Sequence, residues 1–332
     1  MRRLVLLAIL LLLGAGAYFI MKPDPGYASK QTATDLLISH KTAGLEYPEN
    51  AEEGFRASLA MDVEAIEMDV HMVRDGRIIL HHDPVLSDYN CFAKGDKTRL
   101  IVAQQTVETL AALDCINHKV NARYRIATLD HFLEIYRNTD QSKKLLIEIK
   151  VWDELIENNP LHEGLDIGKM HYPDAEVVRS VYRLLRRFPE VTNIQFNTFS
   201  RDLLLELRKQ KRPDEPFEFG LLYKGYYNPF AMTIPALVTG NQCYDFCWTP
   251  DYEEVRGWLN DNDIDIFIPH FDQATSLPFR CGFQRHIMQD SGDLTVIPWT
   301  LNAAKQWSTF EAGSFDGILT DKPTGYRAWA SD

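Results

Sequence analysis

The sequence predicts a (β/α)8 barrel with long inserted loops, preceded by an N-terminal hydrophobic segment. Eight short apolar runs of strand length occur along the chain, and amphipathic helical patterns lie between most of them. Strands that alternate with helices form a parallel sheet, and eight such units close into a barrel. The chain has 332 residues, of which 45% are hydrophobic, so it can bury a core of that size. We expect the barrel to occupy residues 35–332.

Each predicted strand is a short apolar run that is flanked by polar residues. Runs of this length suit strands that are buried in the centre of a barrel. The eight runs are Asp35–His40, Val63–Val70, Lys144–Lys150, Asn193–Asn197, Phe217–Leu222, Asp265–Pro269, Leu294–Trp299 and Phe315–Thr320.

Helical patterns and two long connections fill the intervals between these runs. Asn50 is expected to cap a helix, residues 172–188 carry an apolar stripe with basic residues opposite, and Ser200 begins another helix. The connections 84–127 and 223–262 are much longer than ordinary loops. Such loops usually carry function or structure of their own, so we expect them to pack near the mouth of the barrel.

Residues 1–22 are predicted to be a signal anchor or a signal peptide, and residues 23–34 a linker. Leu4–Met21 is an apolar run of 18 residues behind Arg2 and Arg3, just long enough to span a bilayer. It is longer than the apolar region of most signal peptides, although its Ala-Gly-Ala sequence could serve a signal peptidase. A buried helix of a soluble protein is a third interpretation. The positive-inside rule places the folded part outside the cytoplasm, on the membrane or, after cleavage, secreted or periplasmic.

Charge and cysteine content narrow the choice of partners. The chain has 35 basic and 47 acidic residues and a net charge of −12, which argues against a nucleic-acid partner and suits a divalent cation.

An odd number of cysteines leaves at least one unpaired in a monomer. Cys91 and Cys115 could join the loop between them, whereas Cys243 and Cys247 could pair only if their segment is turned or helical. The fifth is Cys281.

Carboxylates recur at the ends of the second and third predicted strands. Glu67 and Asp69 are two residues apart, so their side chains point to one face, and Glu148 and Lys150 repeat this spacing. If that face is the barrel interior, these groups converge near the C-terminal rim, where barrel enzymes keep their chemistry. Three oxygen donors favour Mg²⁺ or Ca²⁺, and also Mn²⁺, over zinc. A salt bridge at the rim is the structural alternative for each acid.

Two histidines are predicted to face the same mouth. His40 ends the first strand, and His82 follows a short hairpin. Beside a metal cluster, such a pair suits a general base and a general acid on opposite sides of a phosphorus centre. The strand before His81 and His82 alternates, so only one of these two can point inward. The other histidines are expected to have no role in the site: His71, His118, His131, His162, His171, His270 and His286.

Short blocks of sequence follow one another from about residue 36 to residue 325. They read ISHKTAGLEYPEN, IEMDVHMVRDGRIILHHDPVL, LLIEIK, IPWTLN and FDGILTDKP. Together they resemble the glycerophosphodiester phosphodiesterase family, whose pattern is HRG, PEN, ExD, DG, HD, ExK, WTxN and DGIxTDxP. The resemblance implies a (β/α)8 barrel and the metal-dependent hydrolysis of glycerophosphodiesters to glycerol 3-phosphate and an alcohol.

The resemblance also implies roles for the catalytic and metal-binding positions. His40 and His82 are similar to the catalytic pair of the family. His82 is favoured over His81 because the family histidine directly precedes Asp-Pro. The positions that match the metal ligands are Glu67, Asp69 and Glu148.

Four further positions are expected to contact the substrate. Glu49 and Lys150 match residues that line the family site, and Trp299 resembles the aromatic residue against which glycerol packs. Lys41 stands where the family has arginine, and the loop that follows it is longer. Because lysine offers a point charge in place of a bidentate fork, we expect a less rigid grip on phosphate.

A second class of reaction uses the same residues. A phospholipase D-like enzyme would act on lysophospholipids or other membrane phosphodiesters, and the hydrophobic N-terminal segment would bring it to them. In that case the apolar connection 223–262 would be a lid that faces lipid, although packing onto the barrel is the simpler expectation. A non-catalytic binding protein is a third interpretation, which the full set of predicted site residues disfavours.

Overall fold

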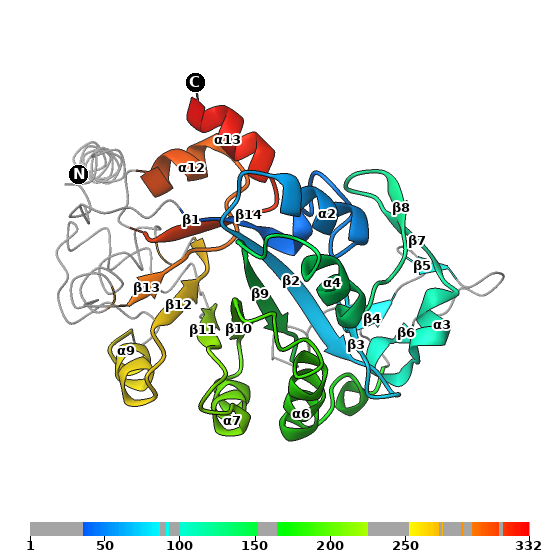
Figure 1. Ribbon diagram of the computed structural model, residues 1–332. Helices are drawn as coiled ribbons and strands as arrows, with labels where there is room; N and C mark the ends of the chain where they lie inside the picture. Colours follow the sequence, from blue (N-terminus) through cyan, green and yellow to red (C-terminus); the bar gives the residue numbers. More distant parts are fainter. Residues whose placement is uncertain are drawn as a thin grey trace, which may run out of the picture.

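Eight parallel strands form a nearly closed ring in the computed structural model, which describes residues 36–86, 91–92, 100–151, 165–224, 252–271, 274, 287, 294–311 and 315–331 (Figure 1). Hydrogen bonds from Asp316 N to Val296 O (2.9 Å) and from Leu319 N to Pro298 O (3.3 Å) link the last two strands. The predicted barrel is confirmed, and every strand overlaps its predicted run. In order around the ring they are β1 (Leu36–Ser39), β2 (Ala65–Met72), β9 (Lys144–Ile149), β10 (Ile194–Thr198), β11 (Glu218–Tyr223), β12 (Ile266–Pro269), β13 (Thr295–Val296) and β14 (Gly317–Thr320).

Helices surround this ring and connect its strands (Figure 1). Ser200 accepts a hydrogen bond from Leu203 N at the start of α7, which confirms the predicted helix start. The prediction that Asn50 caps a helix is wrong, because the cap position of α2 is Ala51 and the Asn50 amide bonds Asp69. The helices are α2 (Glu52–Ala60), α4 (Leu129–Tyr136), α6 (Asp174–Leu185), α7 (Arg201–Gln210), α9 (Tyr252–Asp261), α12 (Ala304–Glu311) and α13 (Pro323–Ser331).

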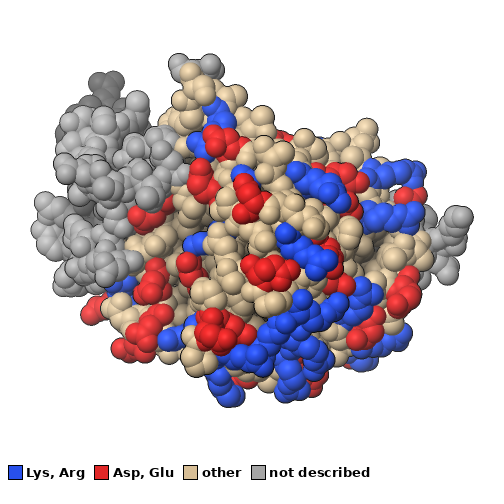
Figure 2. Space-filling view, viewed as in Figure 1, with Lys and Arg blue, Asp and Glu red and all other residues tan. Residues whose placement is uncertain are grey.

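The helix α6 has the predicted apolar stripe with basic residues opposite. Val178, Val181 and Tyr182 are buried, while Arg179 and Arg183 are exposed. Figure 2 shows Lys and Arg side chains gathered in the lower part of this view, around the place of α6 in Figure 1, with acidic side chains between them. The outer face of this helix is therefore a mixed, solvated surface.

Alternation along the strands decides which side chains enter the barrel. Ile66 and Ile147 belong to the large core between the ring and the helices, whereas Ala65 and Leu146 belong to the core inside the ring. Because the side-chain period of a strand is two, every second residue after Ala65 and Leu146 also points inward. These positions are Glu67, Asp69 and Glu148.

The connection between β2 and α4 carries structure of its own, as predicted. It has a separate apolar core, to which Ile79, Leu86 and Leu110 contribute. Short antiparallel strands build it, so the connection is folded against the barrel. Its elements are β3 (Ile78–Leu80), β4 (Val85–Leu86), β5 (Cys91–Phe92), β6 (Leu100–Ile101), η2 (Val102–Gln104), α3 (Val107–Ala111), β7 (Asp114–Asn117) and β8 (Ala122–Tyr124).

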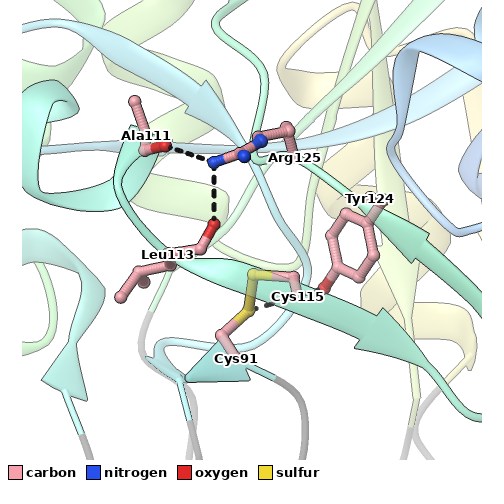
Figure 3. The surroundings of a disulfide bond; sticks show 6 residues. All are labelled: Cys91, Ala111, Leu113, Cys115, Tyr124 and Arg125. Carbon is pink, nitrogen blue, oxygen red and sulfur yellow. Dashed lines mark hydrogen bonds between the residues drawn. A yellow bond between two sulfur atoms is a disulfide. The ribbon is translucent and has the colours of Figure 1, made fainter. Parts of the chain in front are cut away.

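A disulfide between Cys91 and Cys115 joins β5 to β7, which confirms that predicted pair (Figure 3). The two residues are directly opposite in the antiparallel register. Beside them, the Arg125 guanidinium donates hydrogen bonds to the carbonyl oxygens of Ala111 (2.9 Å) and Leu113 (3.3 Å). These bonds fasten the end of α3 and the residue before β7 to the segment that follows β8. The other three cysteines lie outside the described residues.

Two sequence predictions concern segments that lie outside the described residues. One is the N-terminal segment with its linker, residues 1–34, and the other is most of the connection 223–262. Among the helices that the structure does describe, none is long and apolar enough to cross a membrane. The membrane segment and the lid therefore stay predictions.

Candidate active site

Three buried carboxylates meet inside the barrel at the C-terminal ends of its strands. Glu67 and Asp69 lie on β2, and Asp69 is paired in register with Glu148 on β9. All three side chains are buried, and one oxygen of each lies within 4.8 Å of the others. The spacing of two residues on each strand brings these groups together, as the sequence predicted.

The chemistry of this cluster fits a divalent cation. Glu67 Oε1 and Asp69 Oδ1 are buried and have no hydrogen-bond partner among the residues that the structure describes. Burial raises the pKa of the Glu67 carboxyl to about 8, and the charge of Asp69 adds to this effect. Burial also acts to raise the pKa of Asp69, but Lys150 and the nearby histidines hold it below its ordinary value. Free carboxylate oxygens that repel one another are what Mg²⁺, Ca²⁺ or Mn²⁺ would satisfy.

Lys150 supplies a positive charge beside this cluster. Its Nζ lies 2.6 Å from Glu148 Oε1 and 3.5 Å from Asp69 Oδ1. Burial acts to lower the pKa of the ammonium, but the two carboxylates outweigh it and the pKa is raised. Lys150 therefore remains charged next to the reacting centre.

His40 follows β1 and is held between two carboxylates. Its Nδ1 donates a hydrogen bond of 2.7 Å to Asp321 Oδ1, and its Nε2 lies 3.8 Å from Glu67 Oε2. Burial acts to lower the pKa of His40, but the charges of Asp321 and Glu67 raise it above its ordinary value. Asp321 is itself fixed by Asn302, whose Nδ2 donates to Asp321 Oδ2 over 2.6 Å. The imidazole thus has one orientation, with Nε2 toward the cluster.

A strained turn follows His40. Lys41, Thr42 and Ala43 all have left-handed backbone conformations, with φ of 49°, 56° and 63°. This conformation is unfavourable for residues with a Cβ, so surrounding contacts must hold it. Lys41 N donates to Glu67 Oε2 over 2.7 Å, and a Cβ at Gly54 would collide with Thr42 O. The turn therefore aims a backbone donor at a metal-ligand candidate.

His82 lies in the loop after β3 and is more exposed than His40. Its Nδ1 donates a hydrogen bond of 2.8 Å to Asp83 Oδ1, and both residues line the cavity. His81 is buried and points elsewhere, as the alternation required. His71 Nε2 donates to the carbonyl oxygen of His82 over 3.2 Å, so a residue of β2 helps to hold this loop. His71 therefore assists the site, a role that the sequence did not suggest.

A cavity of about 410 Å³ opens over these groups. Most of the predicted site residues lie on its wall, whereas Asp69 is buried behind it. Trp299 forms one side: its indole Nε1 donates to Ile268 O over 3.0 Å, and its ring meets the Phe199 ring edge-on at 5.6 Å. The predicted residues on the wall are His40, Lys41, Glu67, His82, Glu148, Lys150 and Trp299.

Glu49 is placed differently from the other predicted residues. It is not on the cavity wall, and its Oε2 accepts a hydrogen bond of 3.1 Å from Lys119 Nζ in the β7–β8 connection. Burial acts to raise the pKa of Glu49, but the charges of Lys41 and Lys119 lower it below its ordinary value. Glu49 thus joins the inserted connection to the rim of the site.

Comparisons with known proteins agree with this geometry. The model of the glycerophosphoryl diester phosphodiesterase family matches residues 40–181, which include both histidines and all three carboxylates. A glycerophosphodiester phosphodiesterase of Caldanaerobacter subterraneus subsp. tengcongensis is 25% identical over 66% of this chain and 87% of its own length. The family model and the curated relatives all indicate the glycerophosphodiester phosphodiesterase family. These similarities are consistent with a phosphoric diester hydrolase.

Two further relatives extend the similarity over almost the whole chain. Lysophospholipase D GDPD3 of Mus musculus is 22% identical over 93% of this chain and 86% of its own length. The solved structure of an Oleispira antarctica phosphodiesterase, in complex with the product sn-glycerol-3-phosphate, has the same fold. Its TM-score is 0.62 at 16% identity, and the match covers 89% of this chain and 96% of that chain.

Sequence reasoning missed several residues of this candidate site. Asp321 and Asn302 were present in the blocks FDGILTDKP and IPWTLN but received no role. Asp83 was read only as the residue that identifies His82. Asn50 donates from Nδ2 to Asp69 Oδ2 over 2.8 Å and accepts from Asp69 N, so it orients a metal-ligand candidate. Lys224 lines the cavity after β11, and no motif pointed to it.

Proposed function

We propose that this chain is a metal-dependent phosphodiesterase that hydrolyses glycerophosphodiesters to glycerol 3-phosphate and an alcohol. One observation carries the proposal: His40 and His82 open onto one cavity beside the carboxylate cluster, and each has its own carboxylate partner. The similarity to this family supports the substrate class. The Oleispira antarctica phosphodiesterase of similar fold, which holds sn-glycerol-3-phosphate, supports the product.

The two histidines transfer protons. Because Nδ1 of each ring is bonded to a carboxylate, Nε2 is the nitrogen left for the substrate. One histidine removes a proton from the attacking oxygen, which belongs either to water or to the glycerol 2-hydroxyl. Attack by the hydroxyl gives a cyclic phosphate. The other histidine protonates the departing alcohol.

Charged groups around the phosphate stabilise the negative charge that grows on its oxygens. Glu67, Asp69 and Glu148 would hold the divalent cation, which, when bound, supplies Lewis acidity to the phosphate. Lys150 stabilises the growing charge from the β9 side through its fixed ammonium. Lys41 adds a second positive charge from the end of β1.

A panel of phosphodiesters assayed with and without chelator tests this function. We expect release of glycerol 3-phosphate from water-soluble glycerophosphodiesters, complete loss with EDTA, and recovery with Mg²⁺, Ca²⁺ or Mn²⁺. A soluble form that begins at Lys22 should retain this activity, because the barrel begins with β1. Full activity after exhaustive chelation would remove the metal from the proposal. Absence of glycerol 3-phosphate from every diester would remove the function itself.

A lysophospholipase D activity is the second candidate. The similarity to the Mus musculus lysophospholipase D supports it, as does the predicted membrane segment. Turnover of lysophosphatidylcholine against that of glycerophosphocholine separates the two activities. Preference for the acylated compound would favour the second candidate.

We also propose that residues 1–22 place the phosphodiesterase at a membrane, with its barrel outside the cytoplasm. The Cys91–Cys115 disulfide supports this location, because disulfides persist in oxidising compartments. A cleaved signal would give a secreted or periplasmic enzyme instead. Extraction of membranes with alkaline carbonate distinguishes an anchored protein, which stays with the lipid, from a released one.

A further inference from the structure

Three lysines line the cavity, and two of them have no carboxylate partner in the described part of the chain. Lys150 is paired with Glu148 and Asp69. Lys41 and Lys224 form no ion pair with any carboxylate that the structure describes. The site therefore presents two ammonium groups that a substrate can use.

These two lysines lie on opposite sides of the mouth. Lys41 follows β1, and Lys224 follows β11. Around the ring, β11 is four strands from β1 in either direction. The histidine and the metal-ligand candidates lie at the ends of β1, β2 and β9, so the phosphate belongs on that side. Lys224 therefore meets another part of the substrate.

The side of the cavity near Lys224 is otherwise mainly apolar. Phe199, Leu222 and Trp299 line it, and Lys224 Nζ lies 6.0 Å from the centroid of the Trp299 ring. At this distance the ammonium is attracted to the aromatic face. Lys224 is exposed, so its remaining hydrogen bonds go to water until a substrate arrives. An aromatic wall with one ammonium donor suits a small group that has both carbon atoms and hydroxyls.

We propose that Lys224, together with Trp299, recognises the glycerol group of the substrate through its free hydroxyls. Lys224 then selects deacylated glycerophosphodiesters over lysophospholipids. This inference rests on the proposed function, because it takes a glycerophosphodiester as the substrate. Trp299 provides the surface for the carbon atoms, and the ammonium replaces its water ligands with the hydroxyl oxygens.

The cost of covering a charge explains the selection. Hydroxyl oxygens accept hydrogen bonds from the ammonium, so the ammonium keeps partners when glycerol displaces its water. An acyl chain over Trp299 would cover the same ammonium with hydrocarbon and leave its donors without partners. Desolvation of an unpaired charge is strongly unfavourable, so the acylated compound binds less well.

Two substrates with the same head group test this selection. Glycerophosphocholine is compared with its 1-hexanoyl ester, kept below its micelle concentration, so that only the acyl chain differs. In the Lys224→Met variant we expect kcat/KM on glycerophosphocholine to fall roughly 10-fold, mainly through KM, because a hydrogen bond to a charged group is lost. The hexanoyl ester should be unchanged or gain, so the preference shrinks about 10-fold or more. Lys224→Arg should keep the preference.

Controls separate failure of this inference from failure of the function. Lys209→Ala changes an exposed lysine of α7 and should behave like the wild type. Thermal unfolding verifies that each variant is folded. An unchanged preference in folded Lys224→Met, or a wild type that prefers the hexanoyl ester, would overturn the role of Lys224 and leave the phosphodiesterase intact. A wild type that releases glycerol 3-phosphate from no diester would overturn both.

Discussion

The two histidines of the site are held by carboxylates in different surroundings. At the end of β1, His40 is buried and its partner, Asp321, lies 281 positions away at the end of β14. In the loop after β3, the His82 side chain is 35% exposed and its partner is the next residue, Asp83. A charged hydrogen bond is stronger where water is excluded. The same pair of groups should therefore matter more at the barrel end than in the loop.

Replacement of the histidines themselves should have the largest effect. His40→Ala and His82→Ala should each lower kcat on the order of 10²–10⁴-fold, because each removes a proton-transfer group. Thermal stability should change little. A nitrophenyl ester, whose leaving group needs no proton, should rescue the variant that lacks the acid and not the one that lacks the base. Steady-state kinetics on both substrates would then assign the roles.

Retained activity would contradict this part of the mechanism. If both folded variants keep more than about a tenth of the wild-type turnover, the activation free energy has risen by less than about 1.4 kcal/mol. If the histidines only pack in the core, their replacement would instead lower the melting temperature and leave the remaining folded enzyme active. Either result would remove the histidine pair from the proposal.

Replacement of the two carboxylate partners should have a larger effect at His40 than at His82. Burial acts to raise the pKa of Asp321, but His40 and Asn302 lower it to about 2, so it is ionised at neutral pH. Asp321→Asn should lower kcat/KM roughly 10- to 100-fold, because a buried charge-assisted bond is lost. Asp83→Asn, the matched change at an exposed pair, should cost less than about 5-fold. Equal losses would show that burial does not distinguish the pairs.

Removal of the disulfide should act on the loop region alone. The apolar core beside Cys91 and Cys115 includes Ile79 and Leu86, which flank His82. The double variant Cys91→Ala, Cys115→Ala should lower the free energy of unfolding by about 2–4 kcal/mol, because the unfolded chain gains conformational entropy without the crosslink. Hydrogen exchange should rise in residues 100–124 and stay unchanged in β1. Faster exchange in β1 would mean that the two regions are not independent.

The smallest effect is expected at the ion pair between Lys119 and Glu49. The Lys119 side chain is 57% exposed, so Lys119→Ala should cost under about 1 kcal/mol of stability at pH 7. The pKa of Glu49 is lowered in the folded protein, so the pair stabilises the fold above that pKa and loses its effect as the pH falls. The cost should begin to shrink as the pH falls below the ordinary pKa of a glutamate, about 4.3, and vanish below the lowered pKa of Glu49, as chemical denaturation at several pH values can verify. Lys211→Ala, which changes a lysine that forms no ion pair with the residues that the structure describes, is the control.

The barrel and its carboxylate cluster could be predicted because both follow from short-range patterns. An apolar run identifies each strand, and a spacing of two places Glu67 and Asp69 on one face. The same alternation required that only one of His81 and His82 face inward. The motif selected His82, and His82 is the one of the two that lines the cavity.

Other features depend on contacts that no local pattern contains. The bond between His40 and Asp321 requires the last strand of the barrel to lie beside the first. Asn50 has the sequence context of a helix cap, yet its amide serves Asp69 because the turn before α2 brings it into the barrel. The short strands of the inserted connection have two to four residues, too few for a periodic signal.

The bond between His40 and Asp321 also couples activity to the completion of the chain. During synthesis His40 is made early, and its partner follows only with β14, the last strand of the barrel. Until that strand docks beside β1, the imidazole has neither its orientation nor its supporting charge. A nascent or truncated barrel that lacks Asp321 should therefore hydrolyse diesters poorly, even when its metal-ligand candidates are in place. The His40 imidazole is therefore fully oriented only in the completed barrel.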